Sequence, residues 1–223
     1  MISFSHTNNM YIFQPDRYLL QKQIKSVAHY IQGKVLDVGA GEMDRYGRHF
    51  KMKERFRMDV APGPNVDIVG SADKIPFPPE TFDSIVCTQV FEHLKYPQKS
   101  AMELFRVLKK GGHAVITVPQ MNELHEEPHD YFRYTKYGLN VVFQDAGFTI
   151  VESHQRGGYY ATLAQVRIRH WIGIMDLYDR PFIGRVLGKL IGVYGHFMIW
   201  LDDKHIFKDD RTQTIGWCVV LKK

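Results

Sequence analysis

The sequence has few cysteines: only Cys87 and Cys218 occur among 223 residues, far apart and each in an apolar run. A disulfide framework is therefore not predicted, and a reducing compartment fits this cysteine usage. The first residues, MISFSHTNNMYIFQPDR, lack the basic region, the long apolar stretch and the small-residue cleavage site of a secretory signal. We therefore expect a cytoplasmic protein.

Dense runs of lysine and arginine are also missing, as are zinc-finger spacings and aromatic-glycine RNA-binding signatures, so no nucleic-acid partner is predicted. The formal net charge is +5 and the isoelectric point is about 9.1. This excess permits attraction to anionic lipid or to a phosphorylated substrate without choosing between them. With 44% hydrophobic and 24% charged residues, the chain has the composition of an ordinary globular protein with one large core.

Residues 125–129, HEEPH, match the HExxH pattern of zinc metalloproteases letter for letter. That motif binds zinc because a continuous helix places its two histidines on the same face. Here Pro128 lies inside the pattern, and Pro119 and Asn122 leave little room for a helix to begin before it. We therefore reject the protease interpretation.

Strand-like and helix-like segments alternate along the chain, which predicts an α/β fold with a parallel sheet and helices on both of its faces. For the polar stretch 42–53, both a short helix and a loop fit the sequence. The predicted strands cover residues 34–39, 55–60, 66–70, 82–90, 113–119, 148–153 and 212–221. Helices are predicted over residues 15–32, 98–110 (ended by Gly111 and Gly112) and 136–147, with two or three more over 158–203.

The stretch KVLDVGAGEMD joins a predicted strand to a glycine-containing loop. Gly39 and Gly41 let the backbone turn tightly and approach a ligand at the carboxyl end of the sheet. Asp37, at the tip of the strand, suits a ligand with a cationic group, and the dinucleotide fingerprint GxGxxG is absent because Asp44 replaces its third glycine. Asp59 ends the next strand, where a carboxylate can accept hydrogen bonds from ribose hydroxyls. Together these residues indicate a cationic ligand that carries a ribose.

These residues, with GSADKIPFPPETFDSIVCTQVFEHL and LFRVLKKGGHAVITVP, resemble the class I S-adenosylmethionine-dependent methyltransferases over roughly residues 33–155 and the last strand. The resemblance implies a Rossmann-like, doubly wound, mostly parallel seven-stranded sheet with S-adenosylmethionine as cofactor. The family's third glycine and its adenine-loop aspartate are replaced by Met43 and Ser71. The cofactor-binding residues implied by the resemblance are Asp37, Gly39 and Gly41 at the methionine end, Asp59 at the ribose, Ala72 and Asp73 beside the adenine, and Gln89 near the methyl group.

The candidate acceptor residues follow the fourth and fifth predicted strands. The FEHL motif resembles Glu-His pairs of quinone O-methyltransferases in this family and supplies Glu92 and His93, and the loop after Pro119 supplies His125, His129, Asp130, Tyr131 and Arg133. Because a hydroxyl attacks well only when a base takes its proton, we predict that His129, oriented by Asp130, or else His125, is that base. The other assignments are His93 as a further catalytic candidate and Glu92, Tyr131 and Arg133 as substrate-binding residues. A salt bridge within the loop is the alternative for Arg133. A metal ion held by His93, His125 and His129 is an alternative to the base, but we predict no metal.

Residues 158–203 are apolar and aromatic, with basic residues between them and glycines at positions 184, 188 and 192. Arg185 and Lys189 argue against a membrane-spanning helix. Two interpretations stay open: a basic amphipathic surface that contacts a lipid leaflet, and a helical cap packed over the pocket.

The sequence therefore predicts one methyltransferase domain over residues 1–223, with an N-terminal helical extension (1–32) and a helical insertion or cap (158–210). The predicted activity is S-adenosylmethionine-dependent O-methylation of a small or lipid-linked acceptor such as a saccharide. One alternative is a quinone or other aromatic O-methyltransferase. The other is a catalytically silent cofactor-binding module that regulates a partner.

Overall fold

The computed structural model describes residues 12–204 and 212–223. The described chain divides into two compact units, a helical one (12–20, 157–204 and 212–215) and a larger one that holds the sheet (21–156 and 216–223). The predicted insertion 158–210 falls in the helical unit, except that its residues 205–210 lie outside the described residues. Residues 1–11 of the predicted N-terminal extension also lie outside them.

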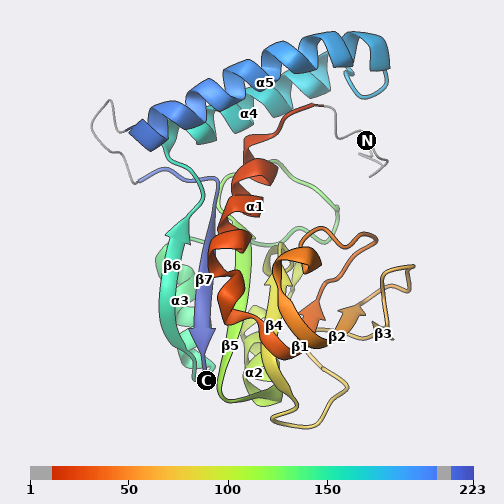
Figure 1. Ribbon diagram of the computed structural model, residues 1–223, viewed down its shortest axis with the longest axis vertical. Helices are drawn as coiled ribbons and strands as arrows, with labels where there is room; N and C mark the ends of the chain where they lie inside the picture. The colour runs from red at the N-terminus through yellow and green to blue at the C-terminus, as the bar shows by residue number, and fades with distance from the viewer. Residues whose placement is uncertain (1–11, 205–211) are drawn as a thin grey trace. The chain divides into compact units, whose positions relative to one another are not determined.

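The larger unit is built around a seven-stranded sheet with the strand order β3-β2-β1-β4-β5-β7-β6 (Figure 1). The pairs β1–β2, β2–β3, β1–β4 and β4–β5 are parallel, whereas β7 is antiparallel to both β5 and β6. The strands are β1 Gln32–Val38, β2 Lys51–Asp59, β3 Ile68–Val69, β4 Phe82–Thr88, β5 Leu108–Pro119, β6 Thr149–Gln155 and β7 Gly216–Lys222.

The sheet is mixed: four strand pairs are parallel, as expected for the predicted mostly parallel sheet, and the two pairs of β7 are antiparallel for a topological reason. The chain leaves the end of β6 at Arg156 and returns to β7 at Gly216, and the Arg156 amide donates to the Gly216 carbonyl at 2.8 Å. Because residues 157–215 leave and re-enter at the same edge of the sheet, the returning strand must run antiparallel to β6. Both ends of the connection therefore belong to one strand pair, as in a hairpin with an insertion.

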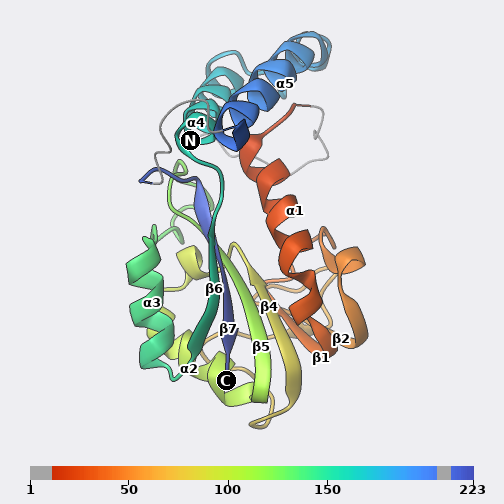
Figure 2. The ribbon, with the colours of Figure 1, turned by 60° about the vertical axis from the view of Figure 1, so that its left-hand side comes forward.

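Helices cover both faces of the sheet, as the alternating pattern predicts. Helices α2 (Pro97–Val107) and α3 (Lys136–Asp145) lie on one face, and the part of α1 (Pro15–Val27) that belongs to this unit, residues 21–27, lies on the other (Figure 2). A continuous apolar core fills the space between the strands and α2 and α3, with fully buried Phe82, Phe91 and Phe143 in it. On the opposite face, Ile24 and Val27 of α1 are buried. Both cysteines are free and buried in the sheet, Cys87 in β4 and Cys218 in β7.

Several local boundaries differ from the sequence prediction, and two local features matter for the site. Helix α2 ends at Val107 instead of continuing to residue 110, because Leu108 enters β5 and pairs with Phe82 of β4. In the polar stretch 42–53, the only helical turn is the 3-10 helix η2 (Gly47–His49), and β2 begins at Lys51. The loop between β1 and β2 is therefore mostly irregular chain, available to line a site at the carboxyl end of β1.

The helical unit is an antiparallel pair, α4 (Tyr159–Ile174) and α5 (Pro181–Lys204). Apolar residues from both helices form its core, among them Ile168, Ile172 and Ile191. The carboxylate of Asp202, near the end of α5, accepts from the backbone amides of Gly158 at 2.9 Å and Ala161 at 2.8 Å. An anion at the first turn of a helix satisfies amides that have no partner within the helix. Asp202 thereby fixes the start of α4 to the end of α5.

Candidate active site

The loop after β1 is attached to the end of β2. The amides of Gly39 and Ala40 donate to the carbonyl of Met58 at 2.8 and 3.2 Å, and the Gly41 amide donates to the Asp59 carboxylate at 2.9 Å. Gly39 and Gly41 have φ angles of +73° and +61°, in the left-handed region that glycine adopts without strain. The structure therefore brings together three residues that the sequence assigns to one cofactor site, Gly39, Gly41 and Asp59.

The Asp37 carboxylate already has a partner within the protein, because Arg55 of β2 forms an ion pair with it. The Arg55 Nε donates to Asp37 Oδ2 at 3.1 Å, Nη2 also pairs with Asp37, and Nη1 lies 2.5 Å from Asp44 Oδ2. Burial raises the pKa of Asp37, and the Arg55 guanidinium opposes that shift. Two carboxylates and one guanidinium leave one net negative charge, so the site still suits a cationic ligand.

The remaining predicted cofactor residues lie at the same edge of the sheet with partners of their own. Ala72 is buried, and the Asp73 carboxylate accepts from the Ser71 hydroxyl at 2.5 Å and from Lys99 Nζ at 3.3 Å, which lowers its pKa. The Gln89 side chain lies 3.1 Å from the Thr117 hydroxyl, at the end of β5. Gln89 is therefore anchored to the neighbouring strand, and its contact with the cofactor stays a prediction.

The turn after β4 holds the most unusual side chain of the site. The short 3-10 helix η3 (Phe91–His93) buries Glu92 completely. Neither of its carboxylate oxygens has a hydrogen-bond partner in the part of the chain that the structure describes. Burial raises the pKa of the Glu92 carboxyl to about 8. A buried carboxyl without a partner is costly to the fold and is typical of a functional position.

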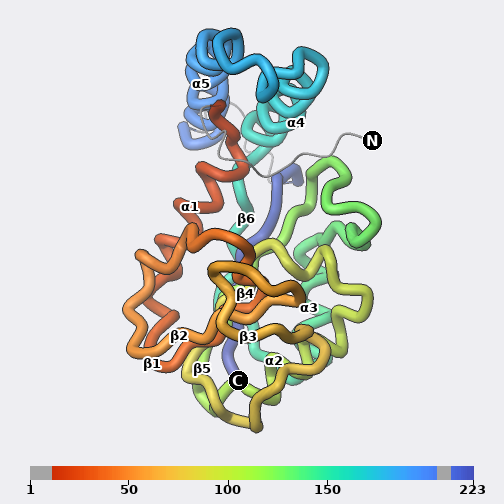
Figure 3. The backbone as a smooth tube through the Cα atoms, turned by 90° about the vertical axis from the view of Figure 1, so that its right-hand side faces the viewer, coloured from red at the N-terminus to blue at the C-terminus, as the bar shows by residue number. Residues whose placement is uncertain are grey.

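The loop after β5 lies against this turn, and the backbone of both segments can be followed in Figure 3. The amides of Tyr131 and Phe132 donate to the Glu92 carbonyl at 2.8 and 3.1 Å, and the Tyr134 hydroxyl donates to the Phe91 carbonyl at 3.1 Å. No helix forms between β5 and α3, all of which is described. The structure thus agrees with the rejection of a zinc-protease helix, and it places this loop at the carboxyl ends of β4 and β5.

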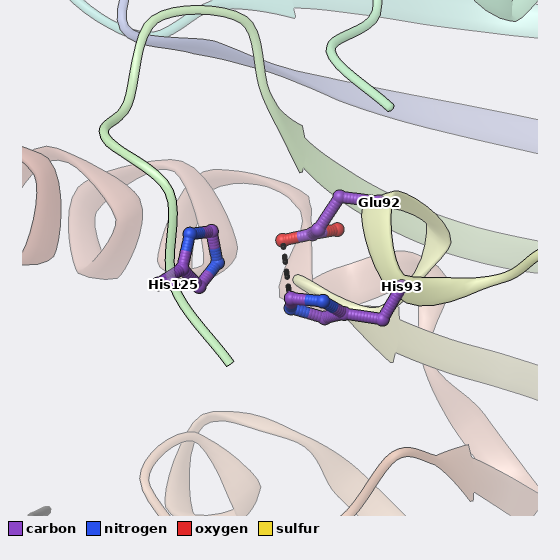
Figure 4. A group of neighbouring side chains, drawn as sticks. All are labelled: Glu92, His93 and His125. Carbon is purple, nitrogen blue, oxygen red and sulfur yellow. Dashed lines mark ion pairs between the residues drawn. The ribbon is translucent and has the colours of Figure 1, made fainter. Parts of the chain in front are cut away.

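Two histidines converge with Glu92 (Figure 4). His93 Nδ1 lies 2.8 Å from the backbone carbonyl of His129, and His125 Nδ1 lies 3.0 Å from the backbone carbonyl of Glu123. Because a carbonyl only accepts, the tautomer that forms these two bonds carries its hydrogen on Nδ1. The Nε2 atom of each neutral ring is then unprotonated and can accept a proton or bind a metal.

The predicted pairing of Asp130 with His129 is wrong. Asp130 instead lies 3.4 Å from His125 Nδ1 and accepts from both terminal nitrogens of Arg133 at 2.6 Å. Although burial opposes ionisation, the bonds from Arg133 lower the pKa of Asp130. His129 is exposed, with Nδ1 3.1 Å from the Tyr131 hydroxyl. The buried Asp130 carboxylate is stabilised by a full positive charge beside it, which the Arg133 guanidinium provides.

The contacts of Arg133 are with other residues of the loop. Besides Asp130 its guanidinium donates to the carbonyls of Phe132 at 2.9 Å and Glu123 at 3.0 Å. The structure therefore shows the salt bridge within the loop that was the alternative for Arg133. Tyr131 is partly exposed beside His129.

Sequence reasoning missed two basic residues of the site. The sequence analysis placed Arg55 on a strand and gave it no role. A basic residue on the strand next to one that ends in an aspartate could have indicated an ion pair between the two strands. Arg156, at the end of β6, is fully buried and donates to Gln23 Oε1 at 2.9 Å. Nothing in the sequence distinguishes it from the many exposed arginines, because its burial depends on where the chain re-enters the sheet.

Comparison with known proteins agrees with this geometry. Residues 36–116 match the family model described as a methyltransferase domain. An uncharacterised protein of Methanocaldococcus jannaschii is 31% identical over 109 residues, which is 48% of this chain and 43% of that protein. A 2-methyl-6-phytyl-1,4-hydroquinone methyltransferase of rice, Oryza sativa subsp. japonica, is 40% identical over 67 residues, which is 30% of this chain and 20% of that enzyme.

Among solved structures, the phosphoethanolamine N-methyltransferase 2 of Haemonchus contortus in complex with S-adenosyl-L-methionine superposes with a TM-score of 0.58 and 16% identity. The match covers 93% of this chain and 52% of that structure, and at this identity it concerns the fold. The chain spans no more than 55% of the length of the curated relatives that it matches. The sheet, the glycine loop and the match over residues 36–116 together give the larger unit the fold of a methyltransferase domain.

Proposed function

We propose that this protein is an S-adenosylmethionine-dependent methyltransferase that acts on the oxygen of a small or lipid-linked acceptor such as a saccharide. The observation that carries the choice of oxygen is the cluster of Glu92, His93 and His125. The cluster lies just after the carboxyl ends of β4 and β5. The glycine loop after β1 lies at the same edge of the sheet. Ligands of such sheets bind at this edge.

The cluster supplies what a hydroxyl acceptor needs. When bound, the cofactor provides a methyl group on a positively charged sulfur. A hydroxyl oxygen forms its bond to carbon readily only if its proton leaves during the attack. The Nε2 atoms of His93 and His125, which carry no hydrogen in the tautomer that forms the Nδ1 bonds, are suited to assist that loss. Asp130 and the Glu123 carbonyl hold the His125 ring in place, so the structure favours His125 over the exposed His129.

A hydroquinone acceptor is the second candidate, favoured by the match to the rice enzyme. Both acceptor classes present hydroxyl oxygen, so the same cluster would serve either. The two are distinguished by offering labelled S-adenosylmethionine together with saccharide or hydroquinone acceptors and identifying the methylated product.

We expect His125→Ala to lower the single-turnover rate of labelled methyl transfer by about 10²- to 10⁴-fold, the range for loss of acid–base assistance. His129→Ala should lower it by only a few fold, because the ring is exposed and lies outside the cluster. His170→Ala, which removes an exposed histidine of the helical unit, is the matched control. Calorimetry must first show that the wild type binds S-adenosylmethionine. Binding without transfer to any hydroxyl acceptor would favour the silent regulatory module instead.

We further propose that the protein is cytoplasmic and contacts the inner face of a membrane through α5. Of the described helices, α5 is the one long and apolar enough to cross a membrane, and about a third of its most apolar stretch is buried within the structure. Arg185 and Lys189 interrupt it. An arrangement along the surface keeps these charges near lipid headgroups and leaves the packing against α4 intact.

The exposed side chains of α5 fit this arrangement. They recur every three or four residues and so share one helix face. Phe182 is 80% exposed, Val193 is 70% exposed, and Arg185 and Lys189 lie beside the stripe. The stripe consists of Phe182, Val186, Leu190, Val193, Phe197 and Trp200. An apolar stripe with basic residues beside it complements an anionic leaflet.

The membrane contact predicts that the full-length protein floats with vesicles of phosphatidylcholine and phosphatidylglycerol at low salt. Val193→Glu should reduce the bound fraction several fold, because it places a charge in the middle of the apolar stripe. Val141→Glu is the matched control, because this valine of α3 in the larger unit is also exposed. Wild-type protein that stays with the soluble fraction, or that only self-associates in gel filtration, would remove the proposal.

A further inference from the structure

Three side chains beside the acceptor edge have the composition and spacing of a metal site. Glu92 and His93 come from η3, and His125 comes from the loop after β5. Their potential ligand atoms all lie within 4.8 Å of one another. Atoms that share one zinc ion lie within about 4.2 Å of each other, twice a zinc–ligand distance of roughly 2.1 Å. Small side-chain rotations would therefore bring this set around one ion.

The two rings are held as metal-binding histidines are held. In most metal sites the ring nitrogen that does not touch the metal donates to a carbonyl or carboxylate, which fixes the tautomer and the ring orientation. His93 Nδ1 donates to the His129 carbonyl, and His125 Nδ1 donates to the Glu123 carbonyl. Both Nε2 lone pairs are thereby left available. The rings stand nearly perpendicular to each other, with their centres 4.9 Å apart.

Glu92 supplies the independent observation that points to a ligand. It is fully buried, and its two oxygens have no hydrogen-bond partner among the described residues. His93 Nε2 lies 3.9 Å from Glu92 Oε1, too far for a hydrogen bond. In Figure 4 the carboxylate points toward both imidazoles. A cation between the three groups would satisfy the carboxylate and both lone pairs at once.

We propose that Glu92, His93 and His125 bind one divalent transition-metal ion such as zinc. Two imidazoles and one carboxylate form a ligand set that suits zinc and its first-row neighbours, and three protein ligands leave coordination positions open. The exposed Glu126 brings a further carboxylate oxygen to 3.7 Å from His93 Nε2. This site uses the first histidine of the HExxH match but not the second, so it owes nothing to the protease motif.

The role of the ion rests on the proposed function. Bound at the acceptor edge, the ion would take over the part proposed above for the two Nε2 atoms, because it would hold the acceptor oxygen in an open coordination position and ease the loss of its proton. Metal binding itself does not depend on that role, because the ligand set is complete without an acceptor. The sequence predicted no metal, since it could not show that Glu92 turns inward beside two histidines from different loops.

Equilibrium dialysis of the full-length protein against Zn²⁺, after chelator treatment, tests the site. We expect one ion per chain and a loss of affinity of at least about 100-fold in His125→Ala, since losing even an outer partner of a ligand costs about 10- to 100-fold. The visible spectrum of the Co²⁺-substituted protein should report imidazole ligation and lose that signature in His125→Ala and in His93→Ala. His170→Ala controls for binding to exposed histidines.

A wild type that takes up no Zn²⁺ at micromolar free metal would overturn the proposal. So would equal affinity in wild type and His125→Ala, or an equal loss in His129→Ala, which would point to the HExxH pair instead. Thermal melts of each variant separate loss of the site from loss of the fold. S-adenosylmethionine calorimetry on the same samples separates failure of this proposal from failure of the proposed function: cofactor binding without Zn²⁺ uptake removes only the metal.

Discussion

Replacing Gly39 with alanine is expected to abolish S-adenosylmethionine binding and to destabilise the larger unit by about 2–4 kcal/mol. The residue sits at φ +73°, and an added Cβ would collide with the side chain of Val90. Valine is stiff at its first side-chain torsion, and Val90 packs against the core, so it cannot easily turn aside. The glycine loop would have to move away from Met58 and Asp59. The hydrogen bonds to these two residues hold the loop in position for the cofactor. Calorimetry with S-adenosylmethionine and a thermal melt measure the two effects.

Two other glycines separate the causes of this effect. At Gly41 an added Cβ would meet nothing within 4 Å, although φ is +61°. Gly41→Ala should therefore lower stability less than Gly39→Ala, yet weaken cofactor binding if the open space in front of the loop is where the ligand lies. At Gly63 the new Cβ would make an ordinary contact with Val66 at 3.6 Å, so Gly63→Ala should alter neither. Unchanged cofactor affinity in Gly39→Ala would show that the glycine loop is not the cofactor site.

Replacing Glu92 with glutamine is expected to stabilise the metal-free protein above neutral pH by a few kcal/mol. Burial raises the pKa of Glu92 from 4.5 in the unfolded chain to about 8 in the folded protein. Below pH 4.5 the carboxyl is protonated in both states, and its contribution to stability is fully present. As the pH rises to about 8, only the unfolded chain releases the proton, so stability falls by up to about 1.4 kcal/mol per pH unit. Glutamine has no proton to lose, so the variant lacks this slope.

Urea unfolding at pH 5, 7 and 9 in the presence of a chelator measures the difference, which should grow from pH 5 to pH 9. Glu103→Gln is a matched control with the opposite sign. The Arg106 guanidinium donates to the Glu103 carboxylate at 2.7 Å and lowers its pKa. That stabilisation is present above the unfolded pKa and is lost as the pH falls through the folded value, so Glu103→Gln should destabilise at neutral pH and matter less in acid. A pH-independent difference between wild type and Glu92→Gln would contradict the burial argument.

Much of the sheet could be predicted because its signals are local. Apolar runs that end in glycine or aspartate locate β1 and β2 and their carboxyl ends, and the loop that joins them needs glycine for a backbone reason visible in the letters. The end of α2 could not be predicted from Gly111 and Gly112, since the helix stops where Leu108 finds a strand partner in Phe82. The direction of β7 was equally hidden, because it depends on where a connection of about sixty residues re-enters the sheet.

The candidate site likewise has a part that the sequence could predict and a part that it could not. Gly39, Gly41 and Asp59 meet because adjacent parallel strands end at one edge, so sequence order was enough to associate them. The partners of Asp37 and Asp130 depend on side chains that reach across the fold, and both turned out to be arginines. The convergence of His93 and His125 depends on an irregular loop whose shape is set by hydrogen bonds to the Glu92 carbonyl, and no periodicity encodes such a shape.

The attachment of that loop has a consequence for how an acceptor binds. Both terminal nitrogens of Arg133 donate hydrogen bonds to Asp130. The amides of Tyr131 and Phe132 donate to the Glu92 carbonyl in the turn after β4. A loop held in this way has lost most of its conformational entropy during folding. The acceptor therefore meets a preorganised surface and need not order the loop at the moment of encounter. Its affinity should depend on the fit of its own groups, with little contribution from loop closure.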